Sequence, residues 1–188
     1  MGKVVVSEFV SVDGVFEDPG GTEGYEHGSW TFEYDRGDEG NQFKLDELMQ
    51  AEVHLLGRVT YEGFAAYWPH QTGDMADTMN GTTKYVVSGT LTSADWQNST
   101  LIPAAAAFAK IAELKQQQGQ NIGITGSGTL VSSLLREGLL DELHLFIFPV
   151  VLGSGTRLFA MPGDKLPLRL IDSATFETGV VHLTYAKA

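Results

Sequence analysis

The residues best suited to chemistry in this sequence are glycines and hydroxyl side chains that follow short apolar segments. Residues 121–129 read as a buried strand and a glycine turn, and a helix is expected over 130–135. Such a turn leaves main-chain N–H groups at a helix N-terminus, where the helix dipole favours an anion, phosphate above all. Gly126 and Gly128 lack a Cβ atom, so a ligand can approach the chain closely there. A plain tight turn is the alternative reading of this pattern.

Two other predicted strand ends share this design. Leu56 runs into Gly57-Arg58-Val59-Thr60 and a helix, and Val87 runs into Ser88-Gly89-Thr90. In an open parallel sheet, ligands bind outside the carboxyl ends of the strands. Together the three turns suit an extended diphosphate ligand. Arg58 would supply positive charge, and the neutral donors would be Thr60, Ser88 and Thr129.

The elements that must position these turns alternate between strands and helices. Helices are expected over 43–51, 60–68, 75–79, 103–118 and 130–135, and a long acidic loop over 16–41. Strands are expected over 3–9, 53–56, 84–87, 100–101, 121–124, 142–150, 166–171, 174–178 and 180–185. This order predicts one three-layer α/β domain over 1–188, with a mixed, mostly parallel central sheet and antiparallel C-terminal strands.

Composition narrows the range of functions. The chain has 188 residues, 43% of them hydrophobic, and a formal net charge of -12. A chain this acidic repels nucleic acid and anionic lipid at long range, and no apolar run is long enough to span a membrane. The absence of cysteine excludes disulfides and thiol chemistry, and fits a cytoplasmic protein. The five histidines are scattered without ligand spacing, so we expect no metal site.

Several of these motifs, taken together, resemble a known family. They are Leu55 to Glu62, Lys84 to Ser88, the Thr125-Gly126-Ser127-Gly128 turn, Gly138 to Leu143, and Pro149 to Gly155. In this order they are similar to the dihydrofolate reductase-like superfamily, in the branch of the reductase (C-terminal) domain of bifunctional riboflavin biosynthesis proteins. The resemblance runs from Lys3 to Phe159 and so covers most of the chain. It implies a reductase that transfers hydride from NADPH to a small heterocyclic substrate, as 5-amino-6-(5-phosphoribosylamino)uracil reductase or dihydrofolate reductase does.

The resemblance also implies roles for particular residues. Gly57, Arg58 and Thr60 would lie at the cofactor phosphates, Ser88 near the adenosine, and Gly126, Ser127, Gly128 and Thr129 at the diphosphate. Asp13 falls where the family places a carboxylate beside the substrate, where it can orient substrate N–H groups and assist proton delivery. An ordinary turn aspartate is the alternative for Asp13. NADH is the alternative cofactor, because Gly89 stands where many relatives have a basic residue.

Three further interpretations stay open on the sequence. Phe64 and Trp68, one helical turn apart, could form an apolar wall of the substrate pocket or pack in the core. The chain could be a non-catalytic member of the fold that binds a nucleotide or a pterin-like ligand. Apolar strand edges near the C-terminus favour a homodimer.

Overall fold

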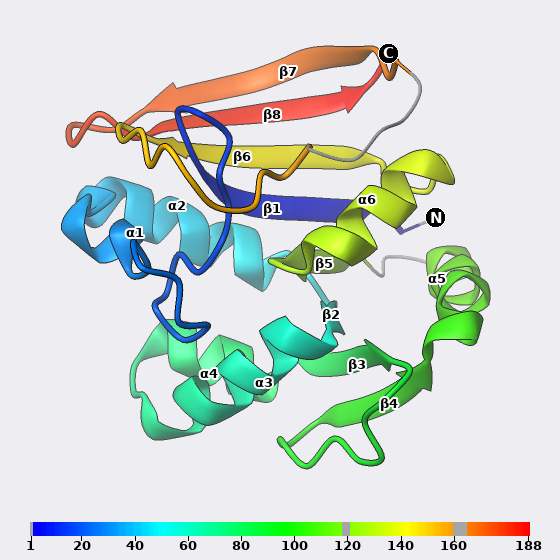
Figure 1. The fold of residues 1–188 in the computed structure, drawn as a ribbon. Coiled ribbons are helices and arrows are strands. Elements are labelled where there is room, and N and C mark those ends of the chain that lie inside the picture. Colours follow the sequence, from blue (N-terminus) through cyan, green and yellow to red (C-terminus); the bar gives the residue numbers. More distant parts are fainter. Residues whose placement is uncertain (1, 118–120, 160–164) are drawn as a thin grey trace. The chain divides into compact units, whose positions relative to one another are not determined.

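The computed structural model describes residues 2–117, 121–159 and 165–188. The described chain divides into two compact units (Figure 1): unit 1 comprises residues 1–5 and 44–127, and unit 2 comprises residues 6–43 and 128–188. The strands follow the order β4-β3-β2-β5-β1-β6-β8-β7 in one eight-stranded sheet. The mixed sheet, mostly parallel with antiparallel C-terminal strands, confirms the predicted α/β fold.

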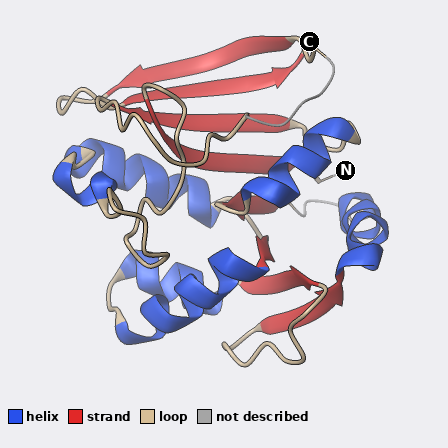
Figure 2. Cartoon of the chain, in the orientation of Figure 1, coloured by secondary structure: helices blue, strands red, loops and turns tan. Residues whose placement is uncertain are grey.

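Unit 1 carries the parallel part of the sheet, with strands and helices alternating along the chain (Figure 2). β2 pairs in parallel with both β3 and β5, and β3 pairs in parallel with β4. One apolar cluster of its core is formed by Leu48, Leu56, Tyr61, Met79, Val86 and Trp96. The elements of this unit are β2 (Val53–Gly57), α3 (Arg58–Tyr67), η1 (Trp68–His70), α4 (Asp74–Gly81), β3 (Thr83–Ser88), β4 (Ser99–Pro103), η2 (Ala104–Ala106), α5 (Ala107–Gln116) and β5 (Ile122–Thr125).

Unit 2 carries the antiparallel strands. β6 (Glu142–Phe148) pairs antiparallel with β8 (Val181–Lys187), which in turn pairs antiparallel with β7 (Leu168–Thr175). Unit 2 contains an aromatic core cluster, formed by Trp30, Phe146, Phe148 and Phe176 with Val180. α1 (Trp30–Glu33) and α6 (Gly128–Arg136) belong to this unit, while β1 (Val4–Ser11) and α2 (Gly37–Met49) begin or end in the other. In the described chain, no helix combines the length and apolarity that crossing a bilayer requires.

The prediction of a long acidic loop over 16–41 is wrong for the C-terminal part of that segment. Residues 30–33 form α1, and α2 begins at Gly37 rather than near Phe43. The Gly37 N–H donates to the Asp35 carboxylate, and Asp38 and Glu39 lie in the first turn of α2. Carboxylates at these positions stabilise a helix N-terminus, so the acids that suggested a loop belong to a helix start.

Two other boundaries differ from the prediction. Pro103 is the last residue of β4 instead of the first residue of a long helix, and the predicted end of that helix at residue 118 lies outside the described residues. The strands predicted over 166–171 and 174–178 are one strand, β7, whose register with β8 shifts between Leu170 and Asp172. The irregularity places one extra residue in the strand, which breaks the alternation of side chains along the sequence.

Candidate functional site

The turn after β2 and the turn after β5 are joined within unit 1 by a hydroxyl pair. The Gly57 N–H donates to Ser127 Oγ at 2.9 Å, and the Ser127 N–H donates to Thr60 Oγ1 at 2.9 Å. The two hydroxyl oxygens lie 3.1 Å apart. The structure therefore brings together three of the residues that the sequence predicted at the cofactor, namely Gly57, Thr60 and Ser127.

The local backbone shows why these residue types are needed. Gly126 and Ser127 both adopt left-handed conformations, with φ values of 66° and 64°. This conformation is unfavourable for serine, and the contacts with Gly57 and Thr60 hold it in place. A Cβ atom on Gly126 would lie 2.9 Å from Thr60 Oγ1, so the approach of the threonine requires glycine.

The first turn of α3 presents main-chain donors and one cation. Its N-cap is Gly57, in an extended conformation, and within the described chain no side chain caps this helix end. The first N–H groups of a helix have no partner inside the helix, so this turn can accept an anion. Arg58, which is exposed, pairs with Glu62 one turn later, with Nη1 2.8 Å from Oε2. Such an exposed pair is weak, and an incoming phosphate can compete for the guanidinium.

Ser88 stands at the third predicted strand end. Its hydroxyl is buried and accepts hydrogen bonds from the main-chain N–H groups of Thr90 (3.1 Å) and Leu91 (2.9 Å). The side chain therefore shapes the turn after β3. The Ser88 Oγ atom also lies 3.5 Å from Thr90 Oγ1, so the hydroxyl is engaged within its own turn.

The N-terminus of α6 belongs to unit 2. Gly128 is the first residue of the helix, and the Phe16 ring lies directly over it: a Cβ atom at Gly128 would be 2.2 Å from Phe16 Cζ. Thr129 is exposed. Glycine at 128 thus permits the close approach of an aromatic ring, a role that the sequence did not reveal.

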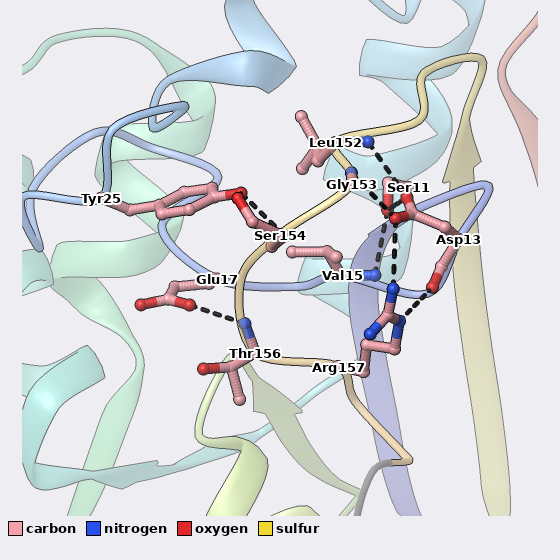
Figure 3. Close-up of polar contacts among 10 residues, drawn as sticks. All are labelled: Ser11, Asp13, Val15, Glu17, Tyr25, Leu152, Gly153, Ser154, Thr156 and Arg157. Carbon is pink, nitrogen blue, oxygen red and sulfur yellow. Dashed lines mark hydrogen bonds and ion pairs between the residues drawn. The ribbon is translucent and has the colours of Figure 1, made fainter.

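Asp13, also in unit 2, is surrounded by donors (Figure 3). Oδ1 accepts from Ser11 Oγ at 2.7 Å and from the Leu152 N–H at 3.1 Å, while Oδ2 accepts from the Gly153 N–H at 3.1 Å. Arg157 Nη2 lies 3.6 Å from Oδ2. These bonds, the Ser11 hydroxyl first among them, lower the pKa of Asp13 to about 2, so the carboxylate is ionised at neutral pH.

Asp13 is one of several residues that join the 11–25 segment to the 150–158 segment of unit 2. The Thr156 N–H donates to Glu17 Oε2 at 2.6 Å, and Tyr25 Oη donates to the Ser154 carbonyl at 2.8 Å. Arg157 Nε donates to the Asp13 carbonyl at 2.9 Å. We call these contacts, made by Ser11, Asp13, Glu17, Tyr25, Leu152, Gly153, Ser154, Thr156 and Arg157, the carboxylate clasp.

The sequence singled out only Asp13 of this clasp. Asp18 was also missed: its buried carboxylate accepts from the N–H groups of Thr22, Glu23 and Tyr25 and so orders the loop that the clasp holds. The available signal was the Asp18-Pro19-Gly20-Gly21 pattern, in which an aspartate before a turn binds the backbone that follows.

Phe64 and Trp68 lie with ring centroids 6.3 Å apart and pack against the core cluster of unit 1. A surface groove of about 710 Å³ opens in the same unit. It is lined chiefly by residues of α3 and of the loop before β4, among them Tyr61, Ala65, Pro69, Leu91, Asp95 and Trp96. Neither Phe64 nor Trp68 lines this groove, and their contacts match the core role of such a pair.

Comparison with known proteins places the chain in a family. Residues 2–182 match the RibD C-terminal domain, and the chain belongs to that family. It is 32% identical to the uncharacterized protein YwjB of Bacillus subtilis over 99% of this chain and 98% of the relative. It is 29% identical to the uncharacterized protein YyaP of the same organism, over 74% of this chain and 76% of that protein.

Solved structures share the fold. A putative riboflavin biosynthesis protein from Shewanella sp. PV-4 has a TM-score of 0.79 at 20% identity, over 100% of this chain and 99% of the other. Dihydrofolate reductase from Enterococcus faecalis, complexed with NADP(H), has a TM-score of 0.60 at 15% identity, over 99% and 96% of the two chains. The chain therefore has a reductase-type, dihydrofolate reductase-like fold, as its motifs indicated.

Proposed function

We propose that this protein is an NADPH-dependent reductase that transfers hydride to a small heterocyclic substrate. The family and the likeness to a reductase that binds NADP(H) support the class of reaction. The observation that carries the proposal is the donor set of unit 1, where three strand ends offer hydroxyls, main-chain N–H groups and one arginine. Residues 57–60, 88–90 and 125–127 include no acid, in a chain whose net charge is -12.

The chemistry of these donors fits the phosphates of a dinucleotide. We assign the phosphate contacts to Gly57, Arg58 and Thr60, because an uncapped helix N-terminus and a guanidinium both favour an anion. Ser127 holds this turn in shape, and Ser88 shapes the turn expected near the adenosine. NADPH is preferred to NADH because Arg58 can pair with a further phosphate, although Gly89 adds no second cation.

We also assign diphosphate contacts to Gly126, Gly128 and Thr129. This proposal is based on the glycine turn motif of residues 125–128 and on the helix N-terminus at the start of α6. Phe16 would have to leave Gly128 for a ligand to reach the backbone there. The family match covers residues of both units, which supports one functional domain over 1–188. A cytoplasmic location stays a prediction from the cysteine-free sequence.

For Asp13 we propose a positioning role. A carboxylate offers about four acceptor sites; Asp13 accepts hydrogen bonds from Ser11, Leu152 and Gly153, and Arg157 forms an ion pair with it at 3.6 Å. With a pKa of about 2, it holds no proton to donate near neutral pH. The bound nicotinamide would supply the hydride, and the proton that balances the reduction would come from solvent.

Because protein groups already contact the Asp13 carboxylate, little of it is left to bind a substrate. This also favours the second candidate function, a non-catalytic member of the fold that binds a nucleotide or a pterin-like ligand. Both candidates predict cofactor or nucleotide binding, and only the first predicts turnover. Oxidation of NADPH should therefore be followed with a panel of pterin, pyrimidine and carbonyl substrates. Turnover of any of them supports the reductase, and binding of NADPH without turnover across the panel supports the binding protein.

A further inference from the structure

The groove between α3 and the loop before β4 lies entirely within unit 1, and none of the residues assigned to the cofactor lines it. Its volume of about 710 Å³ is in the range of small-molecule sites. Ala65 and Ala66 of α3 line the groove together with Leu91 of the loop. The small side chains on the helix leave space that a larger residue would fill.

The base of the groove is aromatic and held in shape. Tyr61 and Trp96 line the groove but are only 5% and 6% exposed, and so form its base. The Trp96 N–H donates to Tyr61 Oη at 3.0 Å, and the Trp96 indole N–H donates to Asn80 Oδ1 at 2.8 Å. Because these bonds already fix the rings, a ligand that packs on them has little to order on binding.

The charged residues that line the groove are both acids, Glu62 and Asp95, and the described lining residues include no lysine or arginine. Glu62 Oε2 pairs with Arg58, and Asp95 Oδ2 accepts from the Ser93 hydroxyl at 3.2 Å. Carboxylates only accept hydrogen bonds, so a ligand must bring donors and positive charge to meet them. The net charge of -12 attracts the same kind of ligand at longer range.

Lys84 decides which part of a ligand can contact the Trp96 ring. This lysine is buried, and its Nζ lies 4.3 Å from the centroid of the ring. It also donates to three main-chain carbonyls, those of Met79, Asn80 and Thr82. A second cation on the same ring would be repelled by Lys84. The positive group of a ligand therefore belongs at the carboxylates, and its apolar part belongs at the rings.

We propose that this groove binds a small organic cation, in which an ammonium or amidinium group is carried on an apolar or aromatic body. The charged group is met by Glu62 and Asp95, and the body packs against Ala66, Leu91 and the aromatic base. Unit 1 thereby has a second ligand site, separate from the proposed phosphate contacts.

Arg58 couples this groove to the turn after β2. Its guanidinium pairs with Glu62, and a phosphate bound at the turn competes for it. The phosphate therefore releases Glu62 for the cation, and the cation releases Arg58 for the phosphate. By linkage, each ligand strengthens the binding of the other by the same factor. The coupling rests on the proposed function, whereas the groove site does not.

NMR titration of the full chain tests the proposal with two probes, benzylamine, which is cationic at neutral pH, and benzyl alcohol, which has the same ring and no charge. Benzylamine should give saturable shifts of the Trp96 indole N–H and the Leu91 amide, and should bind about tenfold more tightly than benzyl alcohol. Equal affinities for the two probes, or no shifts at the groove with either, would overturn the proposal.

Variants locate the binding. Asp95→Asn and Glu62→Gln should each weaken benzylamine binding about threefold, and Ala66→Phe should abolish it by filling the groove. Asp77→Asn is the matched control, because Asp77 is an exposed acid on α4 outside the groove. An Asp77 variant that loses as much affinity as the Asp95 variant would overturn the proposal, because the attraction would then come from the acidic surface as a whole.

Circular dichroism shows whether each variant is folded, and Asp95→Asn, which keeps the shape of the side chain, decides the question if Ala66→Phe is not. Saturating NADPH should raise the affinity for benzylamine about twofold in the wild type and leave it unchanged in Glu62→Gln. NADPH that shifts the amides of residues 58–60 without this effect would overturn the coupling. A failure of NADPH to bind would instead count against the proposed function, and binding of benzylamine in the groove would still support the cation site.

Discussion

The loops of the two units are held in shape by different kinds of hydrogen-bond acceptor. In unit 1, the loops after the strands are held by hydroxyls: Ser127 accepts from Gly57, Thr60 accepts from Ser127, and Ser88 accepts from its own turn. In unit 2, the loops are held by carboxylates, with Asp13, Asp18 and Glu17 as acceptors for main-chain N–H groups. Charged acceptors make the stronger bonds, so their absence from these three turns of unit 1 has a cost in stability; the Asn121 N–H, before β5, does donate to the Glu52 carboxylate at 2.6 Å.

The difference is explained by what each region would bind. A carboxylate beside the turns of unit 1 would repel a phosphate, whereas a serine or threonine shapes the turn and adds no charge. The loops of unit 2 that Asp13, Glu17 and Asp18 hold are not among the proposed phosphate contacts, and there the acidic residues have a structural use. We conclude that the acidic residues of the protein are kept out of the three proposed phosphate-binding turns, and that Glu62, the partner of Arg58, lies one helical turn beyond them.

The comparison predicts different acid sensitivities for the two units, and the largest effect lies in unit 1. His54 is buried, and among the described residues neither ring nitrogen has a hydrogen-bond partner. Burial, with Lys44 and Lys84 nearby, lowers the pKa of His54 from 6.5 to about 4. Below pH 6.5 His54 binds a proton in the unfolded chain but stays neutral in the folded chain until the pH approaches 4. The free energy of unfolding should therefore fall by roughly 3 kcal/mol between pH 6.5 and 4.

Urea unfolding across that range measures this loss. His54→Leu should remove most of the pH dependence, while the exposed His70→Gln should keep it. The contribution of Asp13, whose pKa is lowered from 3.8 to about 2, is complete above pH 3.8 and is lost only as the pH falls from there towards 2. A wild-type protein equally stable at pH 6.5 and 4.5 would contradict the assignment to His54.

Removal of the Asp13 carboxylate from the carboxylate clasp should cause the next largest fall in the free energy of unfolding. Asp13→Ala leaves the Leu152 and Gly153 N–H groups and Arg157 without their acceptor, and should lower the free energy of unfolding by about 2 kcal/mol. Asp13→Asn keeps the shape but loses the charge, so its loss should be smaller. If the positioning role is correct, neither variant adds or removes a titration between pH 5 and 9 in the rate of turnover. A new or missing ionisation in that range would show that Asp13 carries the proton.

The hydroxyl pair should matter less for stability than the clasp. Ser127→Ala removes the acceptor of the Gly57 N–H, and we expect a loss of about 1 kcal/mol in the free energy of unfolding, with weaker binding of NADPH. Ser133→Ala is the matched control, because in the part of the chain that the structure describes its hydroxyl bonds only to the Thr129 carbonyl of its own helix. Equal NADPH affinities in the two variants would show that Ser127 does not contribute to the cofactor site.

Substitution of Arg58 should give the smallest change in free energy, and it should affect NADPH binding more than NADH binding. Arg58→Ala should weaken NADPH binding about fivefold, which is about 1 kcal/mol, and NADH binding less. Glu62→Gln frees the guanidinium from its partner and should strengthen NADPH binding. Calorimetric titration with both cofactors measures the difference, and equal losses for NADPH and NADH would show that Arg58 does not discriminate between them.

The sequence predicted most of the fold because the strand and helix patterns of unit 1 are local. Val53–Gly57 and Thr83–Ser88 are short apolar runs that end in glycine or serine, and both form strands. It failed where the pattern is broken, as in β7, whose irregularity near Ile171 interrupts the alternation. It also failed at α2, where acids that stabilise a helix start resemble those of a solvated loop.

The turns of the candidate site could be predicted, but not their contacts. Glycine and hydroxyl residues after a strand are visible in sequence, so Gly57, Thr60 and Ser127 were found. That they bind one another depends on residues 67 and 70 positions apart in the chain, which a local pattern cannot show. For the same reason Arg157 and Glu17 were missed, since each acts on a loop about 140 residues away.

The central claim is that acid-free turns bind the phosphates of a nicotinamide cofactor, and backbone amide NMR tests it most directly. On titration with NADPH, the account predicts saturable shifts of the Arg58, Val59 and Thr60 amides and of those in the turn before α6. Shifts confined to the groove lined by Tyr61 and Trp96, or no shifts at millimolar NADPH, would contradict it.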